Sequence, residues 1–273
     1  ELGDLWPYSI SAVGVLKKGV LLTLFEKFEL FLYRQSVAVA ALTSAFKVNL
    51  IERGIPADKI HVVINGVDLD RYEPQERNLE LAGRWSLAEK FVVGYIGTHG
   101  MAHGLANVLN SADLLADRDD IVFLFVGAGA ERETLIVDSS RRGQKNVLFI
   151  PAQPKERMPD IWSLCDVALV HLSDSPAFAD VLPSKIFEAM AMGLPVLLVS
   201  PLGEASKLVQ KHNIGLWVPA GEPGLLSEAV RSLAGNRSKL EFLATSSLAV
   251  APEYSREIQA QKMLEVFRWG VEH

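Results

Sequence analysis

Residues 91–126 read FVVGYIGTHGMAHGLANVLNSADLLADRDDIVFLFV, and this stretch decides the fold. It opens and closes with short, nearly unbroken apolar runs, residues 91–96 and 121–126, which are typical of strands buried on both faces. Between them, residues 105–115 carry apolar side chains at helical spacing. A strand, a helix and a second strand in this order predict a right-handed crossover within a parallel sheet.

The same alternation continues through the next hundred residues. Further strands are predicted at residues 147–150, 167–171, 195–199 and 216–218, and helices at residues 131–142, 154–164, 184–192, 204–212 and 224–233. Strands that alternate with helices build a parallel sheet with helices on both faces. The sequence therefore predicts an α/β protein with one complete doubly wound, Rossmann-like domain over residues 88–250.

The chain before this domain, residues 1–70, has a different organisation. Its predicted elements are an amphipathic helix over residues 9–33, a strand over 36–42, a helix capped by Thr43 and a strand over 61–64. The apolar stripe and the lysines of the first helix fit a core helix or, as the weaker alternative, a helix resting on a membrane surface. Because the chain starts at Glu1 with residues typical of the middle of a protein, we expect it to be part of a longer one.

Two shorter segments complete the predicted organisation. Residues 71–87 are polar and include Pro74 and Gly83, which predicts an inter-domain linker. Residues 251–273 contain a last predicted helix, over residues 255–269. This helix follows the sheet domain and is expected to pack outside it.

Composition excludes several classes of protein. With 49% hydrophobic and 22% charged residues, the chain can bury a sizeable core, which excludes a disordered protein. The 27 basic and 33 acidic residues give a net charge of −6 without a long basic run, so nucleic acid is not an expected partner. The single cysteine, Cys165, excludes a disulfide framework and favours a cytoplasmic location. The longest uncharged stretch, residues 189–203, is shorter than the roughly 20 apolar residues that a membrane span needs.

Doubly wound sheets bind ligands beyond the carboxyl ends of their strands, so the loops there are candidate sites. Residues 97–104 (GTHGMAHG) contain glycines, beginning with Gly97, whose backbone N–H groups can approach a phosphate. His99 and His103 can each donate to a phosphate oxygen; the alternative is a tight turn with exposed histidines. In residues 126–129 (VGAG), close packing of the following helix is the favoured role of the glycines.

The loop and helix over residues 180–195 (DVLPSKIFEAMAMGLP) are the most informative. Pro183 suits the first turn of a helix, and Gly193 suits its end. Lys185 near the helix N-terminus opposes the macrodipole by about 0.3–1 kcal/mol, unless an anion binds there. Glu188, one turn further on, can accept both hydroxyls of a ribose. The alternative is a solvated lysine and glutamate at a helix start.

Together these motifs resemble, in their order along the chain, the retaining glycosyltransferases of family 4, which have the GT-B fold. Asp180 and Glu188 reproduce an acid-x7-Glu spacing. The other matching stretches are residues 59–68 (KIHVVINGVD), 125–129 (FVGAG), 165–170 (CDVALV) and 188–195 (EAMAMGLP). The variant LPSKIFE at residues 182–188, with DLWP at residues 4–7, is similar to the branch that builds bacterial surface polysaccharides, such as the colanic-acid, O-antigen and fucosamine transferases.

The resemblance implies a nucleotide-diphosphate sugar, UDP- or GDP-linked, as the donor substrate and no separate cofactor. The residues implied to hold it are Glu188 for the ribose, Asp180 for the donor sugar, Gln153 for the base, and the backbone of Leu182, Pro183 and Ser184 for the diphosphate. The implied acceptor is a saccharide, in this branch linked to a polyprenyl lipid, with possible peripheral contact at the inner face of the membrane. Residues 1–70 would be the last part of an acceptor-side domain, and residues 251–273 would cross back onto it.

Two departures from the family pattern shape the expected site. The first acid is Asp180, one methylene shorter than the usual glutamate, which puts its reach to the sugar in doubt. The usual arginine and lysine of the glycine loop are missing, and Thr98, His99 and His103 stand there instead. We therefore expect Lys185 to neutralise the leaving diphosphate as a positioned cation.

No metal is expected. Residues 117–120 (DRDD) fit an Asp-x-Asp pattern, but they precede a strand and favour a solvated turn. Two other functions fit the same fold and donor: a non-hydrolysing sugar-nucleotide 2-epimerase, and a nucleotide-sugar-binding module without activity. A dehydrogenase is disfavoured because the G-x-G-x-x-G fingerprint is absent.

Overall fold

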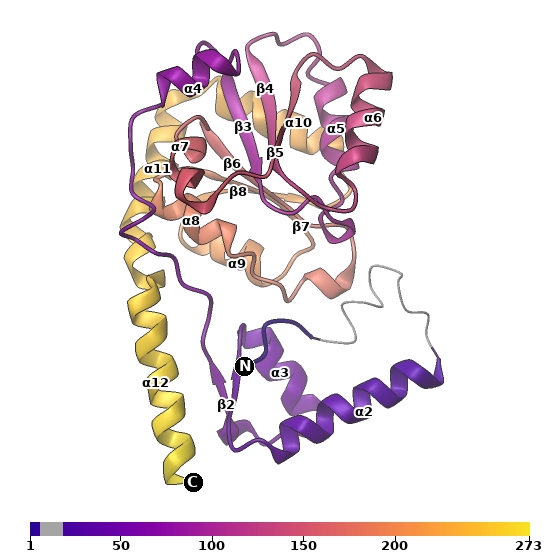
Figure 1. Ribbon diagram of the computed structural model, residues 1–273, viewed down its shortest axis with the longest axis vertical. Helices are drawn as coiled ribbons and strands as arrows, with labels where there is room; N and C mark the ends of the chain where they lie inside the picture. The colour runs from indigo at the N-terminus through magenta and orange to yellow at the C-terminus, as the bar shows by residue number, and fades with distance from the viewer. Residues whose placement is uncertain (6–18) are drawn as a thin grey trace.

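The computed structural model describes residues 1–5 and 19–273, and its largest part is built on a six-stranded sheet (Figure 1). All five strand pairs in this sheet are parallel. The strands are β3 (Phe91–Ile96), β4 (Ile121–Gly127), β5 (Val147–Pro151), β6 (Val167–His171), β7 (Val196–Ser200) and β8 (Gly215–Pro219). The predicted α/β class and doubly wound sheet are confirmed.

Strand order fixes where a ligand can bind. The order across the sheet is β5-β4-β3-β6-β7-β8, so the chain builds outward from β3 in one direction and from β6 in the other. The two halves meet between β3 and β6, where the loops that follow these strands turn to opposite faces of the sheet. A crevice at the carboxyl ends of these two strands is the expected ligand site of such a fold.

Alternation along each strand explains why helices cover both faces. On β4, Val122, Leu124 and Val126 pack in one buried cluster, and Ile121, Phe123 and Phe125 pack in another. The first cluster includes side chains of α7 (Met158–Trp162), α8 (Lys185–Ala191) and α9 (Glu204–Lys211). The second includes side chains of α5 (Ala106–Asp113), α6 (Arg132–Arg142), α10 (Pro223–Ala234) and α11 (Arg237–Val250). Helix α11, which Asn236 caps, was not predicted as a separate element.

Helix α8 carries several of the predicted site residues. It begins at Lys185, with Ser184 at the cap position, so Pro183 lies before the helix rather than in its first turn as predicted. The helix ends as predicted, because Gly193 adopts a left-handed conformation with φ of +69° that suits a glycine. The charged start of α8 therefore lies at the carboxyl edge of the sheet.

The predicted linker, residues 71–87, is not an extended connection. It contains α4 (Leu79–Arg84), which Asn78 caps by accepting from the backbone N–H of Leu81. Leu81, Ala82 and Leu87 are buried in the first cluster of the sheet domain. The polar composition of this segment hides the helix, because only a few of its apolar side chains face the core, while Leu79 is exposed.

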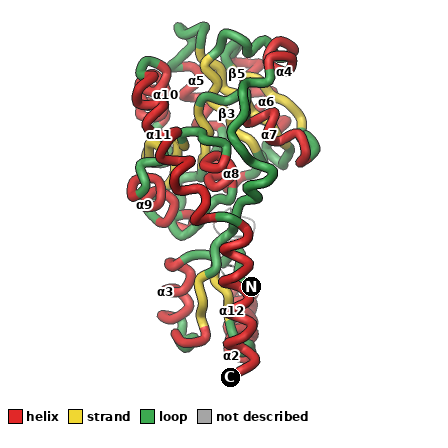
Figure 2. The backbone as a smooth tube through the Cα atoms, turned by 90° about the vertical axis from the view of Figure 1, so that its left-hand side faces the viewer, coloured by secondary structure: helices red, strands yellow, loops and turns green. Residues whose placement is uncertain are grey.

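The remaining elements lie below the sheet domain in Figure 1 and are seen from the side in Figure 2. They are α2 (Val20–Gln35), β1 (Val39–Ala41), α3 (Ser44–Glu52), β2 (Ile60–Val62) and α12 (Arg256–Glu272). The helix predicted over residues 9–33 is described only from Val20 onward, and residues 6–18 lie outside the described part. The predicted cap is confirmed, since Thr43 accepts from the backbone N–H of Phe46 at 3.1 Å.

Helix α12 connects the two parts of the molecule. Its first residue, Arg256, donates its backbone N–H to the carbonyl of Val67, and Val266 packs farther along with Ala40 and Val63. The helix thus runs from the sheet domain back along β1 and β2. In the described part of the chain, no helix combines the length and apolarity required to cross a membrane.

Candidate functional site

The loops after β3 and β4 are in backbone contact, which only glycine permits. Gly97 ends β3 with φ of +140°, and its N–H donates to the carbonyl of Val126 at 2.9 Å. A Cβ atom at Gly127 would overlap the carbonyl of Gly97, and one at Gly129 would overlap the backbone of His99. The glycines of the VGAG stretch therefore let the two loops touch, rather than only letting the next helix pack closely.

The ammonium group of Lys185 reaches back from the start of α8 to this loop. A Cβ atom placed on Gly97 would lie 2.9 Å from Lys185 Nζ, which itself lies 3.9 Å from the centroid of the Tyr95 ring. Nζ is buried and makes no hydrogen bond within the described chain. Burial lowers the pKa of Lys185 to about 7, although Glu188 acts in the opposite direction. A buried ammonium group that makes no hydrogen bond or salt bridge to the described residues, facing a glycine at the switch point, fits an anion-binding position.

Neither loop histidine is exposed, which contradicts the alternative of a tight turn with exposed histidines. The His99 ring is fully buried beside Tyr95, Phe125 and Phe149, with ring centroids 5.8–6.4 Å apart, and neither ring nitrogen has a partner among the described residues. Burial, followed by the charge of Arg132, lowers its pKa to about 4. His99 is therefore neither an exposed loop residue nor placed to donate to a phosphate, because its ring belongs to an aromatic cluster.

A second buried histidine pairs with His103. The backbone carbonyl of His103 lies 2.6 Å from His171 Nδ1, and the carbonyl of His171 lies 3.3 Å from His103 Nδ1. Burial lowers the pKa of both rings to about 4. The histidines near Gly97 are thus neutral at pH 7, so the positive charge beside this loop comes from Lys185 and, near His99, from Arg132.

Glu188 faces a separate polar pocket. Trp162 Nε1 donates to Glu188 Oε2 at 3.3 Å. Burial raises the pKa of Glu188, while hydrogen bonds from Trp162 and Tyr72 and the charge of Lys185 oppose this rise. Burial and the Glu188 carboxylate raise the pKa of Tyr72 to about 12. The pocket measures about 330 Å³ and is lined by Asn65, Gly66, Val67, Asp68, Tyr72, Ser184, Glu188, Arg256 and Gln259.

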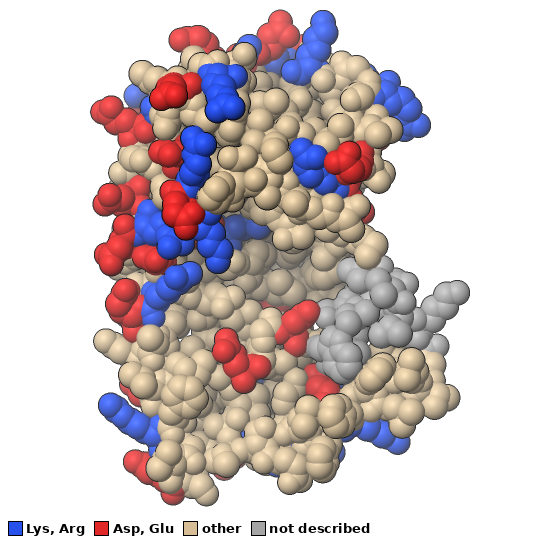
Figure 3. Space-filling model, viewed as in Figure 1, with Lys and Arg blue, Asp and Glu red and all other residues tan. Residues whose placement is uncertain are grey.

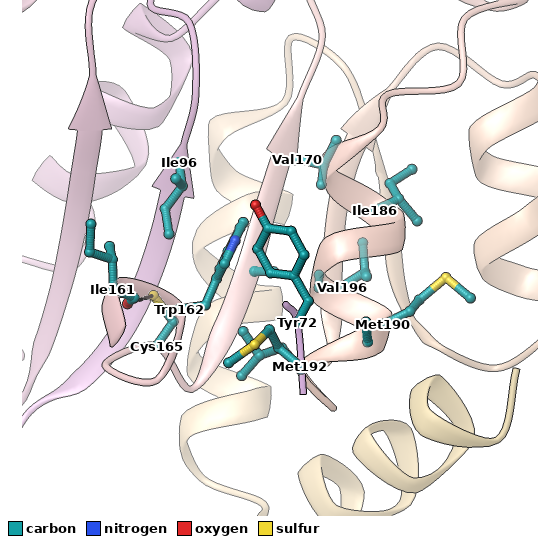
Figure 4. Close-up of a cluster of buried hydrophobic side chains, with 14 of the residues drawn as sticks. Tyr72, Ile96, Ile161, Trp162, Cys165, Val170, Ile186, Met190, Met192 and Val196 are labelled. Atoms are coloured by element: carbon teal, nitrogen blue, oxygen red, sulfur yellow. Dashed lines mark hydrogen bonds between the residues drawn. The ribbon is translucent and has the colours of Figure 1, made fainter. Parts of the chain in front are cut away.

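Figure 4 shows the Tyr72 and Trp162 rings in the buried cluster that also holds Ile186 of α8. Neither ring was among the predicted site residues, and nothing in the sequence marked them. Tyr72 lies in the predicted linker, and Trp162 lies in a helix without a recognisable motif. Tyr95 was also missed, although its position in the strand pattern of β3 places it on the same face as Val93.

Asp180 and its neighbours form the loop that precedes α8. Asp180 is partly buried, which raises the pKa of its carboxyl group against the opposing charge of Lys207. Its backbone carbonyl accepts from Thr43 Oγ1 at 3.1 Å, so the loop contacts the segment below the sheet domain. Leu182 is buried, and Ser184 is exposed at the rim of the Glu188 pocket. Figure 3 shows a hollowed surface between the sheet domain and the segments below it.

Gln153 joins Gly97 and Thr98 around a third pocket. This pocket measures about 290 Å³ at the carboxyl ends of β3, β4 and β5, and it is lined by Ile96, Gly97, Thr98, Val126, Gly127, Ala128, Ala152, Gln153 and Met158. The structure therefore brings Lys185, Thr98 and Gln153 around Gly97, and places Glu188 with Ser184 in a separate pocket.

A larger cavity, of about 580 Å³, lies at the opposite edge of the sheet, among side chains that include Lys90, Asp119 and Arg142. The nearby DRDD turn is solvated as predicted, with Asp117 paired to Arg231 and Asp120 paired to Arg118. Among the described residues, no cluster of three His, Cys, Asp or Glu side chains is arranged to hold a metal ion. The carboxyl edge carries the motif residues and is the better candidate site.

Several known glycosyltransferases are similar in sequence to this chain. The chain is 28% identical over 218 residues to the GDP-mannose-dependent alpha-mannosyltransferase of Mycobacterium tuberculosis, an alignment that covers 80% of this chain and 53% of that protein. It is 28% identical over 158 residues to the putative colanic acid biosynthesis glycosyl transferase WcaI of Escherichia coli, covering 57% of this chain and 38% of that protein. The chain spans about half the length of the curated relatives it matches, from 38% to 62%.

Solved structures share the fold. The Anabaena protein Alr3699/HepE, crystallised with UDP-glucose, superimposes with a TM-score of 0.77 at 22% identity, covering 89% of this chain and 66% of that one. WaaG, a glycosyltransferase involved in lipopolysaccharide biosynthesis, superimposes with a TM-score of 0.74 at 15% identity, covering 96% and 72%. These likenesses support the GT-B architecture. The family model described as "Glycosyl transferases group 1" matches residues 58–247, and the chain belongs to this family.

Proposed function

We propose that this chain is the donor-binding part of a retaining glycosyltransferase that uses a UDP- or GDP-linked sugar. One observation carries the proposal: the buried Lys185 ammonium lies beside Gly97 without a hydrogen-bond partner in the described chain. An anion bound there would compensate the cost of burying this charge. The diphosphate of a nucleotide sugar is such an anion, and the family to which the chain belongs supports this choice.

The neighbouring residues would hold the rest of the donor. In the proposal, Glu188 accepts the ribose hydroxyls, with Trp162 fixing one of its oxygens. Gln153 and the pocket beside Gly97 hold the base, and the backbone from Leu182 to Ser184 approaches the diphosphate. Asp180 approaches the sugar, and its loop is held by Thr43.

Lys185 has a direct role in the proposed chemistry. When the bond between the anomeric carbon and the diphosphate oxygen breaks, negative charge develops on the leaving diphosphate. A cation already in place stabilises that charge without reorganisation. Burial beside Tyr95 strengthens this effect, because water does not screen the interaction.

We propose a saccharide acceptor, linked to a lipid and used in surface polysaccharide synthesis. The names of two relatives support a role in surface polysaccharide synthesis. One is named for colanic acid biosynthesis, and the other, from Bacillus subtilis, for teichuronic acid biosynthesis. A third, from Streptococcus pneumoniae, is named alpha-galactosylglucosyldiacylglycerol synthase. The exposed apolar side chains of α2, including Leu24, Phe28 and Phe31, are where we propose peripheral contact with a membrane that holds such an acceptor.

Thermal unfolding with UDP-glucose and GDP-mannose tests the donor proposal. A nucleotide sugar present at 100 times its Kd should stabilise the protein by about 2.7 kcal/mol. Lys185→Ala should abolish most of this shift, whereas Lys211→Ala, which removes an exposed lysine of α9, should leave it unchanged. The proposal fails if neither nucleotide sugar stabilises the parent protein, or if Lys185→Ala changes the Kd by less than about threefold, ~0.65 kcal/mol.

A further inference from the structure

His103 and His171 are held by a reciprocal pair of hydrogen bonds at the carboxyl edge of the sheet. The backbone carbonyl of each residue faces the Nδ1 atom of the other ring, at distances of 2.6 Å and 3.3 Å. A carbonyl oxygen can only accept a hydrogen bond, so Nδ1 carries the hydrogen in both rings. In a neutral imidazole, the other nitrogen is then an acceptor. The backbone contacts therefore assign the tautomers of both histidines.

The two acceptor nitrogens have different surroundings. His171 Nε2 lies 3.1 Å from the amide nitrogen of Asn107, which donates to it, and this agrees with the assigned tautomer. His103 Nε2 has no hydrogen-bond partner among the described residues and, unlike the ring nitrogens of His99, is not fully enclosed. A ligand can therefore reach one nitrogen of the pair, and that nitrogen is an acceptor.

This acceptor lies near the cation on which the proposed function rests. The His103 ring packs edge-on against Tyr95, with ring centroids 5.9 Å apart, and Lys185 Nζ lies 3.9 Å from the centroid of the same Tyr95 ring. Burial, followed by the charge of Lys185, lowers the pKa of His103 to about 4. A neutral Nε2 has no hydrogen to offer to a phosphate oxygen, and its lone pair repels one. The expectation that His103 donates to a phosphate does not fit this tautomer.

The strand order indicates which part of a donor lies near His103. The pocket beside Gly97 lies over the ends of β3, β4 and β5, whereas His103 is bonded to the last residue of β6, on the other side of β3. A donor that places its base in this pocket and its diphosphate at Lys185 extends its sugar towards β6. The loop that follows β6 also carries Asp180, which the proposed function places near the sugar.

We propose that His103 Nε2 accepts a hydrogen bond from a hydroxyl group of the donor sugar, an inference that rests on the proposed function and adds a specificity-determining residue to it. The position and the tautomer of this nitrogen are both fixed by His171. A fixed acceptor favours a sugar with a hydroxyl at the matching ring position, because a sugar without it leaves the nitrogen unpaired. His103 thus recognises the sugar, while Lys185 recognises the diphosphate.

Calorimetric titration with UDP, GDP, UDP-glucose and GDP-mannose separates these two roles. His103→Phe keeps an aromatic ring against Tyr95 but has no acceptor. For the nucleotide sugar that the parent binds more tightly, this variant should weaken binding at least about fivefold, ~1 kcal/mol, and it should change binding of the matching nucleotide less than about twofold. His103→Gln should retain most of the affinity, because its Oε1 atom can accept in place of Nε2. His273→Phe, the same change at the exposed C-terminus, should leave all affinities unaltered.

Nitrogen-15 NMR of the parent protein tests the tautomer without any substitution. When UDP or GDP is bound, the His103 Nε2 signal should remain that of an unprotonated nitrogen. When the matching nucleotide sugar is bound, the signal should shift in the direction expected for an acceptor that has gained a hydrogen bond. This measurement remains decisive if His103→Phe is unstable.

Several outcomes would overturn the inference while the proposed function stands. Protonation of Nε2 on binding of UDP or GDP would show that His103 donates to the diphosphate. An equal loss of affinity for nucleotide and nucleotide sugar in His103→Phe would show the same, and an unchanged affinity for the nucleotide sugar would exclude the contact with its hydroxyl. If the parent protein binds none of these ligands, the proposed function itself fails, and this inference fails with it.

Discussion

Lys185 Nζ lies 3.9 Å from the centroid of the Tyr95 ring, on the side of the loop where Gly97 leaves room for it. The ring comes from the central strand β3, and the ammonium group comes from the start of α8. The phenol hydroxyl is anchored separately, because it donates to the carbonyl of Thr98 at 2.7 Å. The ring face therefore stabilises the charged form of a lysine that burial would otherwise neutralise.

Tyr95→Leu should lower the pKa of Lys185 below its value of about 7, because the ring face no longer favours the ammonium form. Tyr95→Phe keeps the ring and loses only the hydrogen bond to Thr98, so it should change this pKa much less. The titration of Lys185 can be followed by NMR after isotopic methylation of the lysines. Equal changes in the pKa of Lys185 in the two variants would show that the ring face does not stabilise the ammonium form.

Lys185 should also make the free protein more stable as pH rises. In the unfolded chain a lysine titrates near 10.4, whereas in the folded protein the pKa of Lys185 is about 7. Between these values the unfolded state binds more protons, so the free energy of unfolding increases with pH. Each pKa unit corresponds to about 1.4 kcal/mol.

Urea unfolding between pH 7 and 9.5 measures this slope. Lys185→Met, which preserves most of the side-chain volume, should flatten the slope and be more stable than the parent at pH 7. A variant that keeps the parent slope, or that is clearly less stable than the parent at pH 7, would contradict the burial of an unpaired ammonium group.

Acid should destabilise the protein well before its carboxylates are protonated. The pKa values of His99, His103 and His171 are lowered to about 4, while an unfolded histidine titrates near 6.5. Below pH 6.5 the unfolded state therefore binds more protons, and stability falls as pH decreases towards 5. Asp180 and Glu188 have raised pKa values and oppose this loss only as they begin to protonate.

The difference in unfolding free energy between pH 7 and pH 5 should shrink by roughly a quarter to a third in His171→Gln, because the variant removes one of four rings with a lowered pKa, those of His61, His99, His103 and His171. This difference is informative even if the variant is less stable at both pH values. His273→Gln, at the exposed C-terminus, should leave the difference as it is in the parent. No change in His171→Gln would mean that its ring does not resist protonation.

Gly127→Ala should destabilise the protein strongly and weaken nucleotide binding. The added methyl group would collide with the carbonyl of Gly97 while the residue is held at φ of +153°. Gly143→Ala is the matched control, since Gly143 also has a positive φ of +67° but open space around its Cβ position. The control should lose only about 1 kcal/mol from backbone strain, measured by urea unfolding. Similar losses at the two positions would show that contact between the loops is unimportant.

The sequence predicted the sheet domain well because its signals are local. The apolar run of β6 predicts residues 167–171, and the observed strand is Val167–His171. Gly193 and Thr43 mark helix ends through their own backbone or side-chain preferences, and both predictions are confirmed. Local pattern and tertiary structure agree at these positions.

The features that the sequence did not predict all depend on tertiary contacts. The His99 ring is buried because rings from β3, β4 and β5 surround it, and α4 is held in place because the sheet domain buries its Leu81 and Ala82 side chains. Motif spacing placed Lys185 and Glu188 one turn apart. It could not show that one side chain contacts Tyr95 while the other contacts Trp162.

The hydroxyl of Thr43 makes one hydrogen bond to each of two parts of the molecule. It accepts from the first turn of α3 and donates to the carbonyl of Asp180, in the loop that precedes α8. If the lower segment swings away from the sheet domain, this bond has to break before the loop is released. The position of Asp180, which we propose to lie near the donor sugar, is thereby coupled to the position of the segment that carries Thr43.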